Sequence, residues 1–482
     1  MRAIAMYHHT PIDSLPVELL AHIFSLGTHH VRDSDDSDDS PPFTAESVKA
    51  PLIYGSVCRH WRAVTLRTAA LYTSVCITPL LLRPSADGDV LDTIPISMYV
   101  ARSRACPLDI LIDARDPEWD AFADDGSYYI PPFSAGHMQT ALRTLLPHLV
   151  RWRSLVVLTD LYIPMAAALR PLGAALATHG APQLMDLRLL RCDAHAQAPD
   201  TDDVLFAGLA VDALGAPTPR LRNLQLVGVP AVWDTLPALL RPAFPSAPAS
   251  LETLELSYLP HGTQPTLSQL ARLLHAAPAM QRVVLRGSCL PSFSAFSLSP
   301  ALAFSDAPAV FRLTSIVADD TADLEPPALP LLRALSLSCS SPPAALALLK
   351  LFGATPRLAE ITLDDAEGAI LPFGIDPSGT SGDAPLIATQ AQAGGGAAAV
   401  LAGVLPGRPG AAALFPALAR LTLRGALYPP TMAARDAEFI IGGTRMRTRC
   451  TPTTRSRTRM RGLCRRRSGR RGARWGWRRR WG

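Results

Sequence analysis

The chain has 482 residues and lacks the short motifs that mark most enzymes. No GxSxG nucleophile elbow, HExxH zinc motif, GxxxxGK phosphate loop or kinase motif set is present. The eight cysteines include no CxxC pair, and no histidine cluster stands near them at metal-ligand spacing. We therefore expect a non-catalytic protein without cofactor or metal ion, whose cysteines stay reduced. A catalytic site assembled from distant residues leaves no motif, and that alternative stays open.

Long apolar runs are also missing. No stretch of 18 apolar residues exists, and residues 1–9 lack the apolar segment of a secretory signal. We expect no membrane contact and a cytoplasmic or nuclear location. Charged residues make up only 18% of the chain and hydrophobic residues 48%, so most of it should fold, into about three domains. The 45 prolines and 31 glycines favour many short elements separated by turns.

Acidic residues are absent from residues 444–482, which contain 16 arginines with tryptophans between them. Without these 16 charges the net charge of +5 becomes −11 for the rest of the chain. One interpretation is a disordered arm that binds nucleic acid or acts as a nuclear localisation signal. The other, which we favour, is a shifted reading frame or misjoined intron, because the composition changes abruptly after Ile441.

The most informative pattern in the sequence predicts a short helix that begins near residue 15. Leu15 and Pro16 begin it, and Asp13 or Ser14 can cap its first turn. Residues 57–62, with the sequence Val-Cys-Arg-His-Trp-Arg, belong to a second helical segment. The predicted apolar stripes are Leu15, Leu19 and Ile23 beside Leu20 and Phe24 in the first segment, and Val57, Trp61 and Val64 in the second.

These two segments resemble the F-box, a small all-α module that attaches a substrate receptor to a ubiquitin ligase. The similarity covers residues 11–78 and is closest to the version common in mushroom-type fungi, although Tyr72 stands where the family often has tryptophan. The resemblance implies that the module packs against a Skp-type adaptor. It assigns the adaptor contacts to Leu15, Pro16, Leu19, Leu20, Ile23, Phe24, Val57, Cys58 and Trp61. The alternative is that these side chains form only a local helical core.

An insertion at residues 28–48 interrupts the module. Its residues 33–40 are only aspartate and serine, which cannot bury themselves, so we expect a solvated loop. An acid-directed kinase could phosphorylate it, although a charged spacer is the simpler interpretation. Because the free energy of loop closure grows slowly with length, the insertion need not disturb the two helices.

Beyond residue 100 one short pattern recurs: an apolar residue, two free positions, an apolar residue, one free position, an apolar residue. The instances begin at Trp152, Leu184, Leu221, Leu251, Met280, Leu332, Leu358 and Leu418, usually after a proline. Helical stretches at 266–275 and 343–352 precede two of them. An alternating segment at 107–113 is predicted to start the sheet.

Helix, proline turn and short strand form the unit of a leucine-rich-repeat solenoid. No such strand covers its apolar face alone, so stacked units would form a parallel sheet with leucines inward. The match is irregular, because the family prefers Asn or Cys three residues after the last leucine and only Cys192 fits. A compact α/β domain without a single row of repeats is the alternative.

Strand positions between the leucines should point to the open face of that sheet and offer the best partner-binding surface. The residues assigned to substrate binding are Arg188, Arg222, Gln225, Glu252, Glu255, Arg282, Arg333 and Glu360. The simpler alternative is that these side chains only solvate the sheet.

Together these patterns predict an α/β chain in which a small helical module precedes an irregular leucine-rich-repeat solenoid. The expected ranges are 1–10 for a disordered start, 11–78 for the module, 79–147 for a connecting segment, 148–428 for the solenoid with a flexible insertion at 376–413, and 429–482 for the tail. The resemblance implies the substrate-recognition subunit of a Skp-cullin-F-box E3 ubiquitin ligase, with an unknown protein substrate and, through the adaptor, a cullin-RING ligase as partners. The alternatives are a leucine-rich-repeat scaffold, or a nucleic-acid binder if the arginine tail is real.

Overall fold

The structure is a computed structural model. It describes residues 12, 15–28, 43–86, 88–116, 132–192, 209, 218–240, 250–260, 263–287, 327–338, 351–352, 355–364, 417–428, 433–442 and 445–452. Most of the acidic insertion, the glycine-rich insertion at 376–413 and the arginine tail beyond residue 452 lie outside these ranges, as does most of the helix expected at 343–352.

Four short helices form the amino-terminal part: α1 (Val17–Thr28), α2 (Ala45–Val48), α3 (Ala50–Val57) and α4 (Arg59–Arg67). The chain turns sharply at Cys58, whose φ of −155° and ψ of 171° are extended. The prediction that Val57, Trp61 and Val64 share one helical face is therefore wrong. Val57 ends α3, whereas the other two lie on α4, because the backbone leaves the helical conformation between them.

The segment that follows joins these helices to a sheet. It contains η2 (Ala69–Tyr72), β1 (Ser74–Ile77), η3 (Pro79–Leu81), the hairpin β2 (Leu82–Arg83) and β3 (Val90–Leu91), α5 (Ile94–Arg102) and β4 (Leu108–Asp113). The sequence predicts that the sheet starts at 107–113, which is β4. In the structure β1 precedes it as the edge strand and pairs with β4 in parallel, with Val75 opposite Ile110.

Among the described residues the main sheet has 12 strands in the order β1-β4-β5-β6-β7-β8-β9-β10-β11-β12-β13-β14. Its remaining strands are β5 (Trp152–Thr159), β6 (Asp186–Arg191), β7 (Asn223–Val227), β8 (Thr253–Ser257), β9 (Arg282–Arg286), β10 (Ala334–Ser338), β11 (Glu360–Asp364), β12 (Arg420–Tyr428), β13 (Ala433–Gly442) and β14 (Arg445–Pro452). All pairings from β1 to β12 are parallel, and the last two are antiparallel. The prediction of a mixed α/β chain with a parallel sheet is confirmed. Strands β13 and β14 lie in the range that the sequence assigned to the tail.

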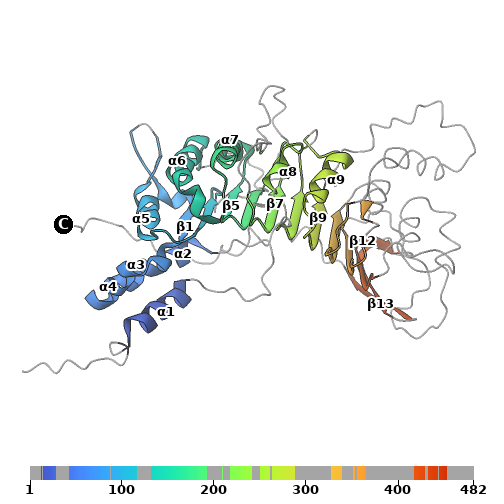
Figure 1. Cartoon of the computed structure of the whole chain (residues 1–482), viewed down its shortest axis with the longest axis horizontal. Coiled ribbons are helices and arrows are strands. Elements are labelled where there is room, and N and C mark those ends of the chain that lie inside the picture. The colour runs from blue at the N-terminus through green and yellow to red at the C-terminus, as the bar shows by residue number, and fades with distance from the viewer. Residues whose placement is uncertain are drawn as a thin grey trace, which may run out of the picture.

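Helices α6 (Ala135–Leu145), α7 (Tyr162–His179), α8 (Leu236–Leu239) and α9 (Leu267–His275), with η4 (Leu146–Arg151), lie along one side of this sheet (Figure 1). The helix predicted at 266–275 is α9, and the side chain of Thr266 caps it by accepting from the backbone N–H of Gln269. The helical module of α1–α4 lies at the end of the sheet that begins with β1.

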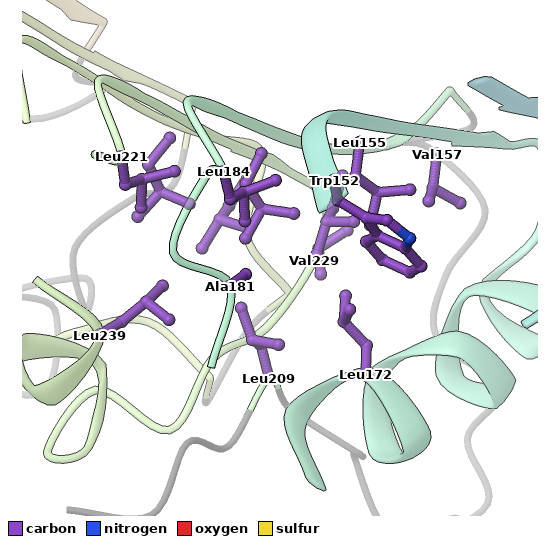
Figure 2. Close-up of a cluster of buried hydrophobic side chains, with 14 of the residues drawn as sticks. Trp152, Leu155, Val157, Leu172, Ala181, Leu184, Leu209, Leu221, Val229 and Leu239 are labelled. Atoms are coloured by element: carbon purple, nitrogen blue, oxygen red, sulfur yellow. The ribbon is translucent and has the colours of Figure 1, made fainter. Parts of the chain in front are cut away.

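The predicted apolar triads supply the core between the sheet and the helices. In strict parallel register one row joins Leu187, Leu224, Leu254, Val283, Leu335 and Ile361, and a second joins Leu189, Leu226, Leu256, Leu285 and Leu337. All are buried. Trp152 of β5 enters this core from the sheet and Leu172 of α7 enters it from the helix layer, and both side chains are buried (Figure 2). The pattern places every second strand residue inside because side chains alternate across a strand.

The backbone repeats the same contact from strand to strand just before this row. The N–H of Arg222 donates to the carbonyl of Met185, that of Glu252 to Arg222, and that of Gln281 to Glu252, each at 2.8 Å. After the strands, Gly228, Tyr258 and Gly287 all have a φ between 52° and 66°. Chain segments of different length therefore return to one repeated local geometry.

Candidate docking surface

Helix α1 has one buried and one exposed apolar side. Leu20 and Phe24 point into the module and are fully buried. Leu19 and Ile23 point to solvent with 52% and 45% of their surface exposed, and Leu26 is exposed beside them. Spacings of four and three residues put these three on one stripe of the helix. The helix therefore carries more apolar surface than its own module covers.

Phe24 is the centre of the module's core. Its ring stacks on Tyr54 of α3 at 4.6 Å between centroids and meets Trp61 of α4 at 4.8 Å. A Cβ added at Gly27 would overlap the hydroxyl oxygen of Tyr54, so the close approach of α1 to α3 requires glycine there. Three helices are thus held by one aromatic cluster.

Helix α3 repeats the arrangement seen on α1. Ile53 and Val57 are exposed to 59% and 58%, and Leu52 is exposed next to them, whereas Pro51 on the opposite side is buried. No charged residue lies between Ala50 and Val57. We define the module surface as the exposed apolar side chains of α1 and α3, which are Leu19, Ile23, Leu26, Leu52, Ile53 and Val57.

Such a concentration of exposed apolar groups is uncommon on a protein surface that stays free in water. Nine of the 15 large hydrophobic side chains that are exposed in the described part of the chain lie between residues 12 and 66. The remainder are scattered over the larger sheet region, among them Ile163 on α7. The module surface is therefore the best candidate for a docking site on this molecule.

The structure separates the nine predicted adaptor contacts into three groups. Five are exposed, two are partly buried and two are fully buried. They are, in that order, Pro16, Leu19, Ile23, Val57 and Cys58; Leu15 and Trp61; and Leu20 and Phe24. The two buried residues pack the module and present no surface to a partner.

Three members of the module surface were missed from the sequence: Leu26, Leu52 and Ile53. Leu26 stands seven residues after Leu19 and three after Ile23, so the helical period of α1 carried the signal. Leu52 and Ile53 could not be assigned to a face without knowing that α3 starts at Ala50 and ends before Cys58.

The turn at Cys58 is built by the residues themselves. The Cys58 sulfur accepts a hydrogen bond of 3.4 Å from the backbone N–H of Trp61, which caps α4. The guanidinium of Arg62 donates to the carbonyl oxygen of Gly55 at 2.8 Å and ties α4 back to α3. These two contacts hold α4 against α3 across the turn.

The module is also joined to the sheet. The hydroxyl of Tyr99 on α5 donates to the carbonyl oxygen of Val48 at 2.5 Å. On the sheet face away from α6 and α7, Phe43 packs on a small buried cluster of Leu111, Val156, Leu158 and Leu190. Both ends of α2 are therefore anchored, so the module is held against strands β1 to β6.

The polar residues predicted to bind substrate lie along the strands of that same open face. Arg188, Gln225 and Glu255 are register partners on β6, β7 and β8. The amide nitrogen of Gln225 donates to Glu255 at 3.0 Å, and Arg286 of β9 approaches the same carboxylate at 3.6 Å. The structure thus joins neighbouring strands through side-chain contacts that the sequence did not predict.

The other predicted substrate residues are distributed more widely. Arg222 and Glu252 form an ion pair at 3.7 Å, and Glu360 pairs with Arg420 at 3.2 Å. Arg282 and Arg333 are exposed on and before neighbouring strands β9 and β10. Side chains of both signs therefore alternate over the face, and no single cluster collects them.

A partly buried polar group lies at the carboxyl ends of β4, β5 and β6. The guanidinium of Arg115 donates to both carboxylate oxygens of Asp113, at 2.7 and 2.8 Å, and Asp160 accepts from the backbone N–H of Asp116 at 2.7 Å. Burial raises the pKa of the neighbouring Cys192 thiol to about 12, so this thiol stays protonated near neutral pH. We interpret the group as structural.

The described residues contain no group of three or more His, Cys, Asp or Glu side chains that could hold a metal ion. None of the helices among them combines the length and apolarity needed to cross a membrane.

Comparison with known proteins adds no family name. No protein-family model matches the sequence, and a search of curated proteins finds no significant match.

Proposed function

We propose that the chain is the substrate-recognition subunit of a Skp-cullin-F-box E3 ubiquitin ligase. Helices α1–α4 form its F-box, and the sheet with its helices forms an irregular leucine-rich-repeat solenoid. The module docks a Skp-type adaptor and, through it, a cullin-RING ligase. The open face of the sheet captures a target protein.

The observation that carries this proposal is the unpartnered module surface. Each large apolar side chain that moves from water into an interface contributes about 1.5–3 kcal/mol. Six partly exposed side chains on α1 and α3 can therefore offset the cost of association, which is about 4–15 kcal/mol. Burial of Leu20 and Phe24 supports the same conclusion, because the module keeps its shape while its outer side remains available.

The register of the sheet supports the solenoid. Equivalent leucines follow one another from β6 to β11, and the strands neighbour one another in chain order. Stacked repeats have strands that neighbour one another in chain order, since each unit contacts only the units before and after it. A compact α/β domain with reordered strands lacks this order.

The mechanism that follows is proximity. The adaptor fixes the module, and Phe43 and Tyr99 hold the module to the sheet, so the open face keeps one orientation toward the ligase. A target bound there meets the ubiquitin-charged enzyme at a high effective concentration. The best candidates for target contact lie at the ends of the polar rows: Arg222 and Arg282, which are exposed, and Glu252, which is partly exposed.

A scaffold that uses α1–α4 only for packing is the second candidate. The aromatic cluster of Phe24, Tyr54 and Trp61 favours it, because this cluster gives the module a core of its own. The two candidates differ in one respect: only the ligase subunit requires a partner on the module surface.

The test is co-elution of the full chain with a purified Skp-type adaptor in gel filtration. We expect a 1:1 complex with the wild type, none with the Leu19→Glu/Ile53→Glu variant, and an undiminished complex with Ile163→Glu. Ile163 has the same exposure as Ile53, 60% against 59%, and lies on α7. Co-elution of the double variant would leave the scaffold as the better account.

A further inference from the structure

Lysine is almost absent from this chain. Of the 46 lysines and arginines only two are lysines, Lys49 and Lys350, and residues 51–349 contain none. The exposed cations of the sheet and its helices, such as Arg143 on α6 and Arg272 on α9, are arginines. Lysine is the side chain that ubiquitin ligases modify, and arginine cannot replace it as an acceptor.

Lys49 is placed at the module surface. It lies between α2 and α3 with helical φ and ψ of −75° and −12°, and its carbonyl accepts from the N–H groups of Leu52 and Ile53 at 3.0 and 3.1 Å. Residues three and four apart share one helix face, so the exposed Lys49 belongs to the same side as Leu52 and Ile53. A polar side chain at the edge of an apolar patch is the usual composition of an interface rim.

We propose that docking of the adaptor covers Lys49, so that the bound receptor presents no acceptor lysine over its described residues to its own ligase. This inference rests on the proposed function. Lys350 lies outside the described residues.

The chemistry makes lysine the deciding group. In ubiquitin transfer the ε-amino nitrogen of lysine attacks the thioester carbonyl that joins ubiquitin to a cysteine of its carrier enzyme. The new isopeptide bond forms, the C–S bond breaks, and the leaving thiolate takes up the proton that the amine releases. A guanidinium holds its proton and its delocalised electrons too firmly to act as this nucleophile. Surface arginines therefore keep the charge of the receptor and offer no acceptor.

The first test is amine labelling of the wild-type full chain with an N-hydroxysuccinimide ester, followed by peptide mass spectrometry. Adaptor binding is measured in the same samples. We expect labelling of Lys49 to fall at least about tenfold when the adaptor saturates the chain, while labelling of Lys350 stays as the internal reference. In the Leu19→Glu/Ile53→Glu variant the adaptor should give no protection. Binding with undiminished labelling of Lys49 overturns this inference alone, whereas absence of binding by folded wild type removes the proposed function and the inference with it.

The second test uses the reconstituted ligase and the Lys350→Arg chain, in which Lys49 is the only lysine. With adaptor, cullin, charged carrier enzyme and ubiquitin present, we expect no ubiquitin on this chain. Adding Arg143→Lys or Arg272→Lys to that chain keeps the charge and should create a modified species in at least one case. Ubiquitin attached to Lys49 would show that the adaptor does not shield this side chain. If neither added lysine receives ubiquitin, the position of the receptor in the ligase, and not its low lysine content, prevents its modification.

Discussion

The hydroxyl of Tyr99 on α5 donates a hydrogen bond of 2.5 Å to the carbonyl oxygen of Val48, 51 residues earlier at the end of α2. Val48 is buried and Lys49 directly after it begins the turn into α3. One side-chain contact thus links α5, in the segment that joins the module to the sheet, to the start of α3. The orientation of the module depends on it.

Tyr99→Phe should therefore destabilise the protein while leaving the ring packing of Tyr72 and Tyr99 in place. The carbonyl of Val48 would remain buried without its partner, which costs about 1–3 kcal/mol. Urea unfolding followed by circular dichroism measures this loss. Tyr54→Phe is the matched control, because that ring stays stacked on Phe24. Equal stability of Tyr99→Phe and wild type would show that the contact does not hold the module.

Gly27→Ala and Gly55→Ala should have opposite effects. A Cβ at Gly27 overlaps the Tyr54 hydroxyl and must displace a ring that stacks on Phe24, which costs about 1–3 kcal/mol. A Cβ at Gly55 meets nothing within 4 Å, and alanine in a helix is favoured over glycine by about 1 kcal/mol. Thermal unfolding should rank Gly55→Ala at or above wild type and Gly27→Ala below it. The reverse order would contradict the packing of α1 on α3.

The stability of the fold should fall in alkali. Burial raises the pKa of Tyr162 to about 12 and also raises the pKa of Tyr72 and Tyr99. In an unfolded chain tyrosine ionises near about 10, so above that pH the unfolded state releases protons that the folded state keeps. The stabilisation is present below pH about 10 and is lost as pH rises toward 12. Urea midpoints at pH 8, 9, 10 and 11 measure it; a midpoint that stays constant across this range would contradict the burial of these phenols.

The cysteines should differ sharply in reactivity. Burial, assisted by the charge of Asp113, raises the pKa of the Cys76 thiol to about 12, and burial does the same for Cys192. Cys58 at the start of α4 is exposed. Because the thiolate is the reactive form, iodoacetamide at pH 8 should modify Cys58 about 100-fold faster than Cys76. Peptide mass spectrometry over time gives the rates, and equal rates would place Cys76 in solvent.

Strands β4 to β12 were predictable from the sequence because their signal is local, whereas β2, β3, β13 and β14 were not predicted. Leu224 and Leu226, for example, follow a proline turn and alternate with polar residues, which is sufficient to define β7 and its buried side. The same pattern placed β4 through its alternating apolar residues. Strand β1 was not found, because Ser74–Ile77 is too short to show a period and is fixed by pairing with β4.

The candidate docking surface was only partly predictable for a related reason. Leu19 and Leu20 are neighbours in sequence, and only the packing of Phe24 on Tyr54 decides which of the two faces outward. The helix break at Cys58 likewise depends on a sulfur cap and on Arg62 reaching Gly55. Contacts between helices determine these features, and the spacing of apolar residues within a single helix does not predict such contacts.

Calorimetric titration of a Skp-type adaptor into the full chain measures directly whether the module surface docks that adaptor. We expect saturable 1:1 binding with a negative heat-capacity change, because apolar side chains of α1 and α3 leave water. Leu19→Glu/Ile53→Glu should abolish the heat, and Ile163→Glu should leave it unchanged. A folded wild-type chain that gives no binding heat at several temperatures, or a double variant that binds as tightly as wild type, would contradict the assignment of this chain to a ubiquitin ligase.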